Sequence, residues 1–142
     1  MLHLFHPALV HLSVAFLIAG GVSEAWGILA RRRGPERFGA VLVLAGTVSL
    51  LPTVVTGSLA ANTVDLPPGA KDSLVLHERI GFVILGVFLV SQFWKAWDRG
   101  RVPDGQKRAY ALFLLAGVML VVFGAYLGGE MVYGYGVGVF ER

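Results

Sequence analysis

The chain has 142 residues, of which 56% are hydrophobic, and it contains no cysteine. An ordinary soluble domain is about 45–50% apolar on a similar count, so the composition indicates a membrane protein. The absence of cysteine excludes disulfides, thiolate metal sites and haem attachment through a C-x-x-C-H motif. The net charge of +3 does not indicate nucleic-acid binding, because the basic residues lie in short joints beside apolar segments.

Four apolar segments are predicted to span a bilayer, at residues 7–30, 37–61, 73–97 and 108–131. A transmembrane helix needs roughly 20 mostly apolar residues, and each segment reaches that length. Almost nothing is left for a soluble domain. We therefore expect residues 1–142 to form one all-α domain, an integral membrane four-helix bundle.

The first segment opens with FHPALVH, residues 5–11. Pro7 suits the first turn of a helix, which puts His6 near the cap and His11 about one turn inside. The chain start lacks a cationic n-region and a small-residue cleavage site, so we expect it to remain as the first helix. Asp72 and Ser73 are predicted to cap the third segment, which puts His77 at a depth similar to that of His11.

Small residues line the second and fourth segments. Ser49, Thr53 and Gly57 follow one another at four-residue spacing, as do Gly124 and Gly128. Such stripes let helices approach closely in lipid, and they also make room for a cofactor. A kink is expected at Pro52.

Lysine and arginine are concentrated in the joints that follow the first and third segments. These joints hold Arg31, Arg32, Arg33, Arg37, Lys95, Arg99, Arg101, Lys107 and Arg108. The other side has Lys71, Arg79 and Arg142. Since short basic loops stay cytoplasmic, we expect a plasma-membrane (inner-membrane) protein with both termini on the extracytoplasmic side.

A faint internal repeat relates the two halves of the chain. His11 and the residues after it match His77 and its successors at an offset of 66. The second and fourth segments match at an offset of 71, through Leu44-Ala45-Gly46 and Leu115-Ala116-Gly117. This pattern favours a duplicated helical hairpin with His11 and His77 as symmetry mates.

Two imidazoles at the same depth in the membrane, on different helices, can coordinate a haem iron from both sides. Polar groups in membrane spans usually face the bundle interior and indicate function. We therefore predict a b-type haem held by His11 and His77, with His6 as the substitute ligand. Ala15 and Gly81, one turn below the two histidines, leave flat space for the ring. Arg79 is expected to pair with a haem propionate, or else to snorkel toward water.

Other readings of these residues remain open. A bare copper or zinc ion bound by His3, His6, His11 and Glu78 is the competing metal site, and it requires His6 to precede the helix, because five residues span about 140° on a helix. A purely structural subunit of a homo- or hetero-oligomeric membrane complex is a further alternative. Glu24 is expected to pair with an arginine of residues 31–33, or else to belong to a proton or quinone path. No nucleophile–base pair or paired-carboxylate site supports hydrolase chemistry.

Three motifs carry a family resemblance: HPALVH at the start, LHERIGF in the third segment and GGEMVYGYGVGVF at the end. With them the chain resembles the bacterial four-helix membrane proteins of domain-of-unknown-function family 2231. The resemblance implies a four-helix bundle with cytochrome b-like properties and association with redox domains. From the predicted haem we expect electron transfer near the outer face, between a membrane donor such as a quinol and a partner protein. It points to His6, His11, His77 and the segment 128–139. Relatives carry histidine where this chain has Tyr135, which puts a second site in doubt.

Overall fold

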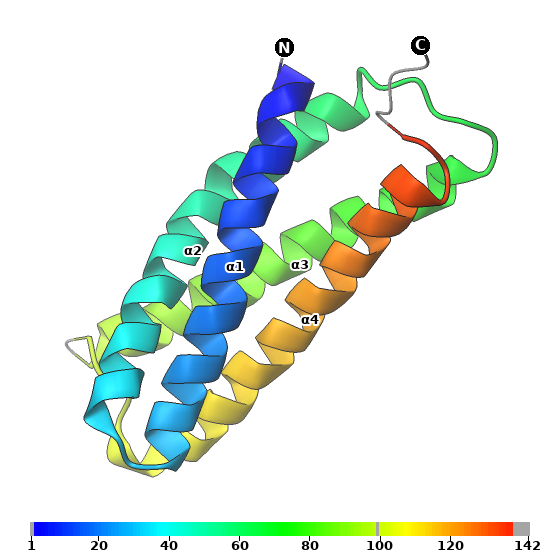
Figure 1. The fold of residues 1–142 in the computed structure, drawn as a ribbon. Coiled ribbons are helices and arrows are strands. Elements are labelled where there is room, and N and C mark those ends of the chain that lie inside the picture. Colours follow the sequence, from blue (N-terminus) through cyan, green and yellow to red (C-terminus); the bar gives the residue numbers. More distant parts are fainter. Residues whose placement is uncertain (1, 99, 138–142) are drawn as a thin grey trace.

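The computed structural model describes residues 2–98 and 100–137, with side chains from His6 onward. It contains the helices α1 (Leu2–Leu29), α2 (Arg33–Ala61), α3 (Ala70–Trp97) and α4 (Lys107–Tyr133), with a short 3-10 turn, η1 (Asp104–Gln106), before α4. Figure 1 shows these elements, and the described residues contain no strand. All four helices are long and apolar enough to cross a membrane, which confirms the predicted all-α bundle.

The starts of α1 and α3 differ from the prediction. Helix α1 begins at Leu2, so Pro7 lies inside the helix and not in its first turn. Helix α3 begins at Ala70, and its N-cap is Gly69 with a φ of +88°. This left-handed conformation suits glycine, which has no Cβ. Asp72 and Ser73 therefore lie within the first turn and are not the caps.

The helices form two hairpins, which we call the first hairpin (α1 and α2) and the second hairpin (α3, η1 and α4). Helix α1 packs against α2 and α4, and α3 packs against α4 and α2, so α1 and α3 occupy opposite corners. The hairpins converge where α1 and α3 end and splay apart toward the opposite end (Figure 1).

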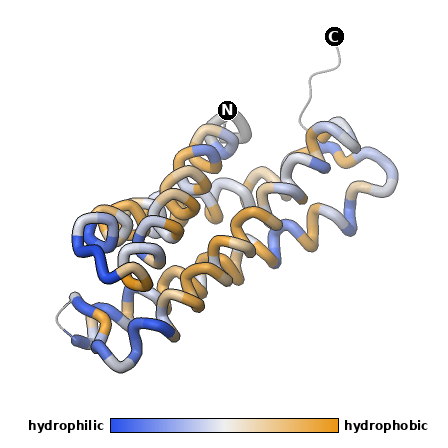
Figure 2. The backbone as a smooth tube through the Cα atoms, turned by 60° about the horizontal axis from the view of Figure 1, so that its bottom comes forward, coloured by the Kyte–Doolittle hydropathy of each residue, from blue (hydrophilic) through white to orange (hydrophobic). Residues whose placement is uncertain are grey.

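We call the end of the bundle that holds the joints 30–32 and 98–106 the basic end. The other end, where α1 and α3 begin, is the histidine end. Hydrophilic residues gather at the turns of the tube while its middle is hydrophobic, as a membrane-spanning bundle requires (Figure 2).

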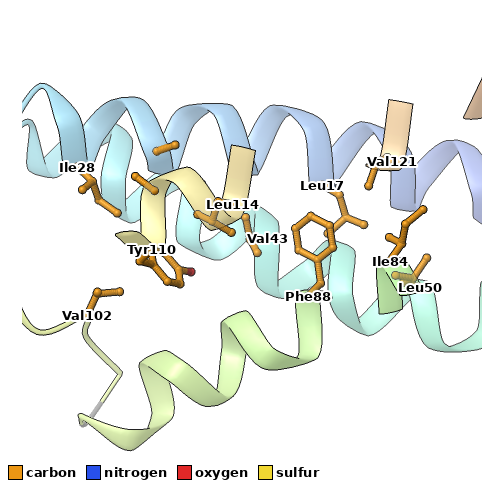
Figure 3. Close-up of a cluster of buried hydrophobic side chains, with 12 residues drawn as sticks. Leu17, Ile28, Val43, Leu50, Ile84, Phe88, Val102, Tyr110, Leu114 and Val121 are labelled. Carbon is orange, nitrogen blue, oxygen red and sulfur yellow. The ribbon is translucent and has the colours of Figure 1, made fainter. Parts of the chain in front are cut away.

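The core is formed by apolar side chains from all four helices. Leu17 of α1 and Phe88 of α3 lie beside each other at its centre, with Val43 of α2 and Leu114 of α4 close by (Figure 3). Phe88, Val43 and Leu114 are fully buried. Many other apolar side chains face outward, among them Trp97, which is 94% exposed. Outward apolar residues are expected where lipid surrounds the helices.

Candidate functional site

His6 and His77 make the same contact, each within its own hairpin. Nδ1 of His6 lies 3.0 Å from the carbonyl oxygen of Thr53, and Nδ1 of His77 lies 3.1 Å from the carbonyl oxygen of Gly124. A carbonyl oxygen can only accept, so Nδ1 donates in both rings. In a neutral imidazole this leaves Nε2 without a proton, and it is then the nitrogen that can bind a metal.

Each of these rings also rests on a glycine of the neighbouring helix. A Cβ added at Gly57 would lie 2.7 Å from Cε1 of His6, and one added at Gly128 would lie 3.2 Å from Cε1 of His77. The close approach needs the missing side chain. The small-residue stripes predicted from the sequence therefore hold the two imidazoles against α2 and α4.

These contacts relate the two hairpins by an offset of 71 residues along the whole of their length. Leu17 packs against Gly46 as Phe88 packs against Gly117, and Ser13 reaches Thr53 as Ile84 reaches Gly124. The offset of 66 expected for the first and third segments is therefore wrong by five residues. His6, and not His11, is the structural equivalent of His77.

The inward side of α1 explains the offset of 71 residues between the hairpins. This side holds His6, Ser13, Leu17 and Glu24. They follow each other at intervals of seven, four and seven residues, which places them on one side of a helix. Their equivalents on α3 are His77, Ile84, Phe88 and Lys95. All are buried except the two histidines, which are half-buried. These intervals stand in the sequence, but only the packing of α1 against its neighbours shows that this side faces inward.

His11 lies on a different side of α1. It is exposed, and its Nδ1 lies 2.6 Å from the carbonyl oxygen of Pro7 in its own helix. Ala15, one turn further, is exposed as well. Because α1 begins at Leu2, His6 and His11 are both helical and stand about 140° apart around the axis.

Around His77, the other predicted residues occupy distinct places. Gly81 is half-buried, and a Cβ added there would meet no atom within 4 Å, so space is open one turn from His77. Arg79 is exposed. Glu78 accepts a hydrogen bond of 2.7 Å from the hydroxyl of Ser58, which joins α3 to α2.

The copper or zinc alternative required His6 to precede the helix, and it does not. Among the described side chains, no three histidine or carboxylate groups gather where one ion could bind them. The side chain of His3 lies outside the described residues, as do Arg99, Arg142 and the end of the segment 128–139. Tyr135 is half-buried beside Gly69, at the start of α3.

A second polar cluster lies near the basic end. Nζ of Lys95 is 3.2 Å from Oε1 of Glu24, and the hydroxyl of Tyr110 donates to the same oxygen at 3.2 Å. Glu24 is only 2% exposed. Glu24 was expected to pair with an arginine of residues 31–33, and Lys95 was counted as a residue of the basic joint. Both expectations are wrong, because α1 and α3 turn these two side chains toward each other inside the bundle.

Comparison with known proteins identifies the family of this chain. Neither a curated protein nor a solved structure matches the chain. A family model described as "Predicted membrane protein (DUF2231)" matches residues 2–141. This match covers nearly the whole sequence and agrees with the four apolar helices. The chain therefore belongs to the DUF2231 family of predicted membrane proteins.

Proposed function

We propose that this protein is a membrane-bound b-type cytochrome in which His6 and His77 hold a haem between the two hairpins. The observation that carries the proposal is the matched pair of hydrogen bonds from Nδ1 of His6 and of His77 to backbone carbonyls. Metal-bound histidine commonly donates its other ring N–H to a carbonyl, which fixes the ring and its tautomer. In both His6 and His77 the Nδ1–H already donates to a backbone carbonyl, so Nε2 is left to bind a metal.

The placement of the two helices supports a ligand bound from both sides. Helices α1 and α3 stand on opposite corners of the bundle. Packed neighbouring helices lie about 8–10 Å apart, which puts opposite corners about 11–14 Å apart where the bundle is closed and further apart where the hairpins splay. This separation leaves room for a flat group between two imidazoles. The hairpins splay at this end (Figure 1), and the space beside Gly81 is open.

When bound by His6 and His77, a haem would supply a reversible one-electron change at its iron. In this proposal the residues of the chain have four tasks. The carbonyls of Thr53 and Gly124 orient the imidazoles, Gly57 and Gly128 set how deeply the rings lie, and the apolar helices exclude water. Arg79 is the cation nearest in sequence to His77 and is proposed to meet a propionate at the surface.

The basic loops support a topology in which the histidine end faces the extracytoplasmic side. Electrons would then come from a donor in the membrane, such as a quinol, and leave to a protein on that side. His11 remains the second choice as partner of His77.

The test is a visible spectrum of the full chain, purified in detergent from cells supplied with a haem precursor. A Soret band with sharp α and β bands on reduction is expected. His6→Ala and His77→Ala should each remove at least nine-tenths of this absorption, while His11→Ala, the matched control on α1, should retain it. Circular dichroism should show unchanged helix content in all three variants.

Two results would count against the proposal. A colourless wild-type protein from haem-supplied cells would exclude the haem. If His11→Ala abolished the spectrum while His6→Ala kept it, the ligand pair would be His11 with His77. In that case the bond from His6 to Thr53 would be a packing contact only.

A further inference from the structure

The interface between the hairpins has approximate two-fold symmetry. Gly21 of α1 lies against Val118 of α4, and the equivalent contact on the other side joins Gln92 of α3 to Thr47 of α2 at 3.4 Å. Positions 21 and 92 are equivalent in the two hairpins, and so are positions 47 and 118. An interface in which a contact and its equivalent both occur in this way is self-complementary and has two-fold symmetry. Either hairpin thus presents the same type of surface to its partner.

Residues on the axis of such an interface meet their own equivalents. Two ionic contacts are of this type: Glu24 with Lys95 at 3.2 Å, which is buried, and the more exposed contact of Glu36 with Lys107 at 3.9 Å. In both, the second residue is the first plus 71. We call these two contacts the axis pairs. The first joins α1 to α3, and the second joins α2 to α4. Lys107 also pairs with Asp104 of η1, at 2.9 Å.

Both axis pairs carry the same arrangement of charge. The glutamate belongs to the first hairpin and the lysine to the second in each case. Two identical hairpins meeting through this interface would place glutamate on glutamate or lysine on lysine at both positions. Since the side chains of Glu24 and Lys95 are only 3% and 11% exposed, like charges there would be poorly screened.

We infer that the axis pairs make hairpin association selective: a first hairpin accepts only a second hairpin and rejects another first hairpin, including that of a second copy of the chain. The duplicated halves meet through equivalent positions, although the apolar side chains there differ in size, as Leu17 and Phe88 do. Opposite charges at the axis positions add a distinction between like and unlike hairpins that does not depend on side-chain size. Polar groups buried at an interface are best known for this role of choosing partners.

The connection between the hairpins allows the same interface to form between two chains. It comprises residues 62–69 and can extend to about 26–29 Å at most. A first hairpin of one chain can therefore associate with the second hairpin of a neighbour without breaking either hairpin. Such an exchange is domain swapping, and it gives the inference a direct test.

The experiment uses two full-length variants that carry different affinity tags. One has both Glu24→Lys and Glu36→Lys, so all four axis positions are lysine. The other has both Lys95→Glu and Lys107→Glu, so all four are glutamate. Neither variant can form a matched pair with itself. Expressed together, each supplies the charges that the other lacks, and a swapped dimer is expected.

The readout is co-purification through both tags in detergent, followed by size determination with light scattering. We expect the complementary variants to co-purify at least fivefold more than two differently tagged wild-type chains, at the mass of a dimer. One chain that carries all four changes should have the same mass as the wild type. As a control, one tagged chain carries Asp72→Lys and the other carries Lys71→Glu, both at exposed positions of α3. Co-purification of this control pair should stay at the wild-type level.

Co-purification of the complementary variants at the wild-type level would overturn the inference. So would failure to recover either chain from the joint expression, because complementary charges should restore the fold. Equal co-purification of the exposed control would overturn it as well, since charge at any position would then suffice. None of these outcomes depends on a bound cofactor.

Discussion

His6 and His77 each donate a hydrogen bond through Nδ1 to a carbonyl that lies 47 residues further along the chain. The equal separation shows that the two hairpins hold their histidines by the same backbone geometry. His6 and His77 are themselves 71 residues apart, as are Glu24 and Lys95 at the other end of the bundle. One pseudo-two-fold relation thus links the candidate cofactor site with the contacts that join the hairpins.

Gly57→Ala should displace the ring of His6. The new Cβ would lie 2.7 Å from Cε1, and overpacking of this kind typically costs about 1–3 kcal/mol of unfolding free energy. Gly128→Ala should cost less, because its Cβ would lie 3.2 Å from the ring of His77. The measurement is denaturant unfolding in detergent.

Gly129→Ala is the matched control, since a Cβ there meets no atom within 4 Å. It should leave the unfolding free energy unchanged or slightly raised. A loss at Gly129 as large as that at Gly57 would show that helix flexibility, and not contact with the imidazole, sets the effect.

Lys95→Met should destabilise the bundle strongly. It leaves the buried carboxylate of Glu24 with Tyr110 as its remaining partner, and breaking a buried ion pair from one side costs about 3–5 kcal/mol. Removing both charges, with Glu24→Gln and Lys95→Met together, should recover most of that loss. Unfolding free energies of the two single variants and the double variant give the coupling directly.

If the double variant were as unstable as the sum of the two single variants, Glu24 and Lys95 would not interact. Tyr110→Phe provides a smaller, separate measurement. It removes one hydrogen bond to a charged group and should cost about 1.5–3 kcal/mol.

Phe88→Ala should cost about 3–5 kcal/mol, because this ring is fully buried beside Leu17 at the centre of the core. Phe93→Ala, five residues further on the same helix, removes a ring that is 72% exposed. It should change the unfolding free energy by less than about 0.5 kcal/mol. Equal losses at the two positions would mean that α3 packs on another protein through its outer face.

Cysteine labelling can test the topology, because the chain has no cysteine of its own. Asp65→Cys lies at the histidine end and Arg101→Cys at the basic end, and both positions are exposed. A membrane-impermeant maleimide should label position 65 in intact cells and position 101 only after the cells are opened. The reverse pattern would place the basic loops outside and contradict the positive-inside expectation.

The sequence by itself determined the four membrane-spanning helices and their short connections. In lipid every backbone polar group must be satisfied within the helix, so long apolar segments have few alternatives. It also pointed to duplicated hairpins and to small-residue stripes at helix contacts, and the structure places those stripes against His6 and His77.

Only the tertiary structure decided which side of each helix faces inward. An apolar helix in lipid is hydrophobic all round, so its sequence carries little periodicity to separate the core face from the lipid face. Because α1 begins at Leu2, His6 and His11 stand on different sides of the helix, and the packing of α1 against α2 turns His6 inward and His11 outward. For the same reason Lys95, read from the sequence as part of a basic joint, became the partner of Glu24: helix rotation and packing bring together side chains 71 residues apart.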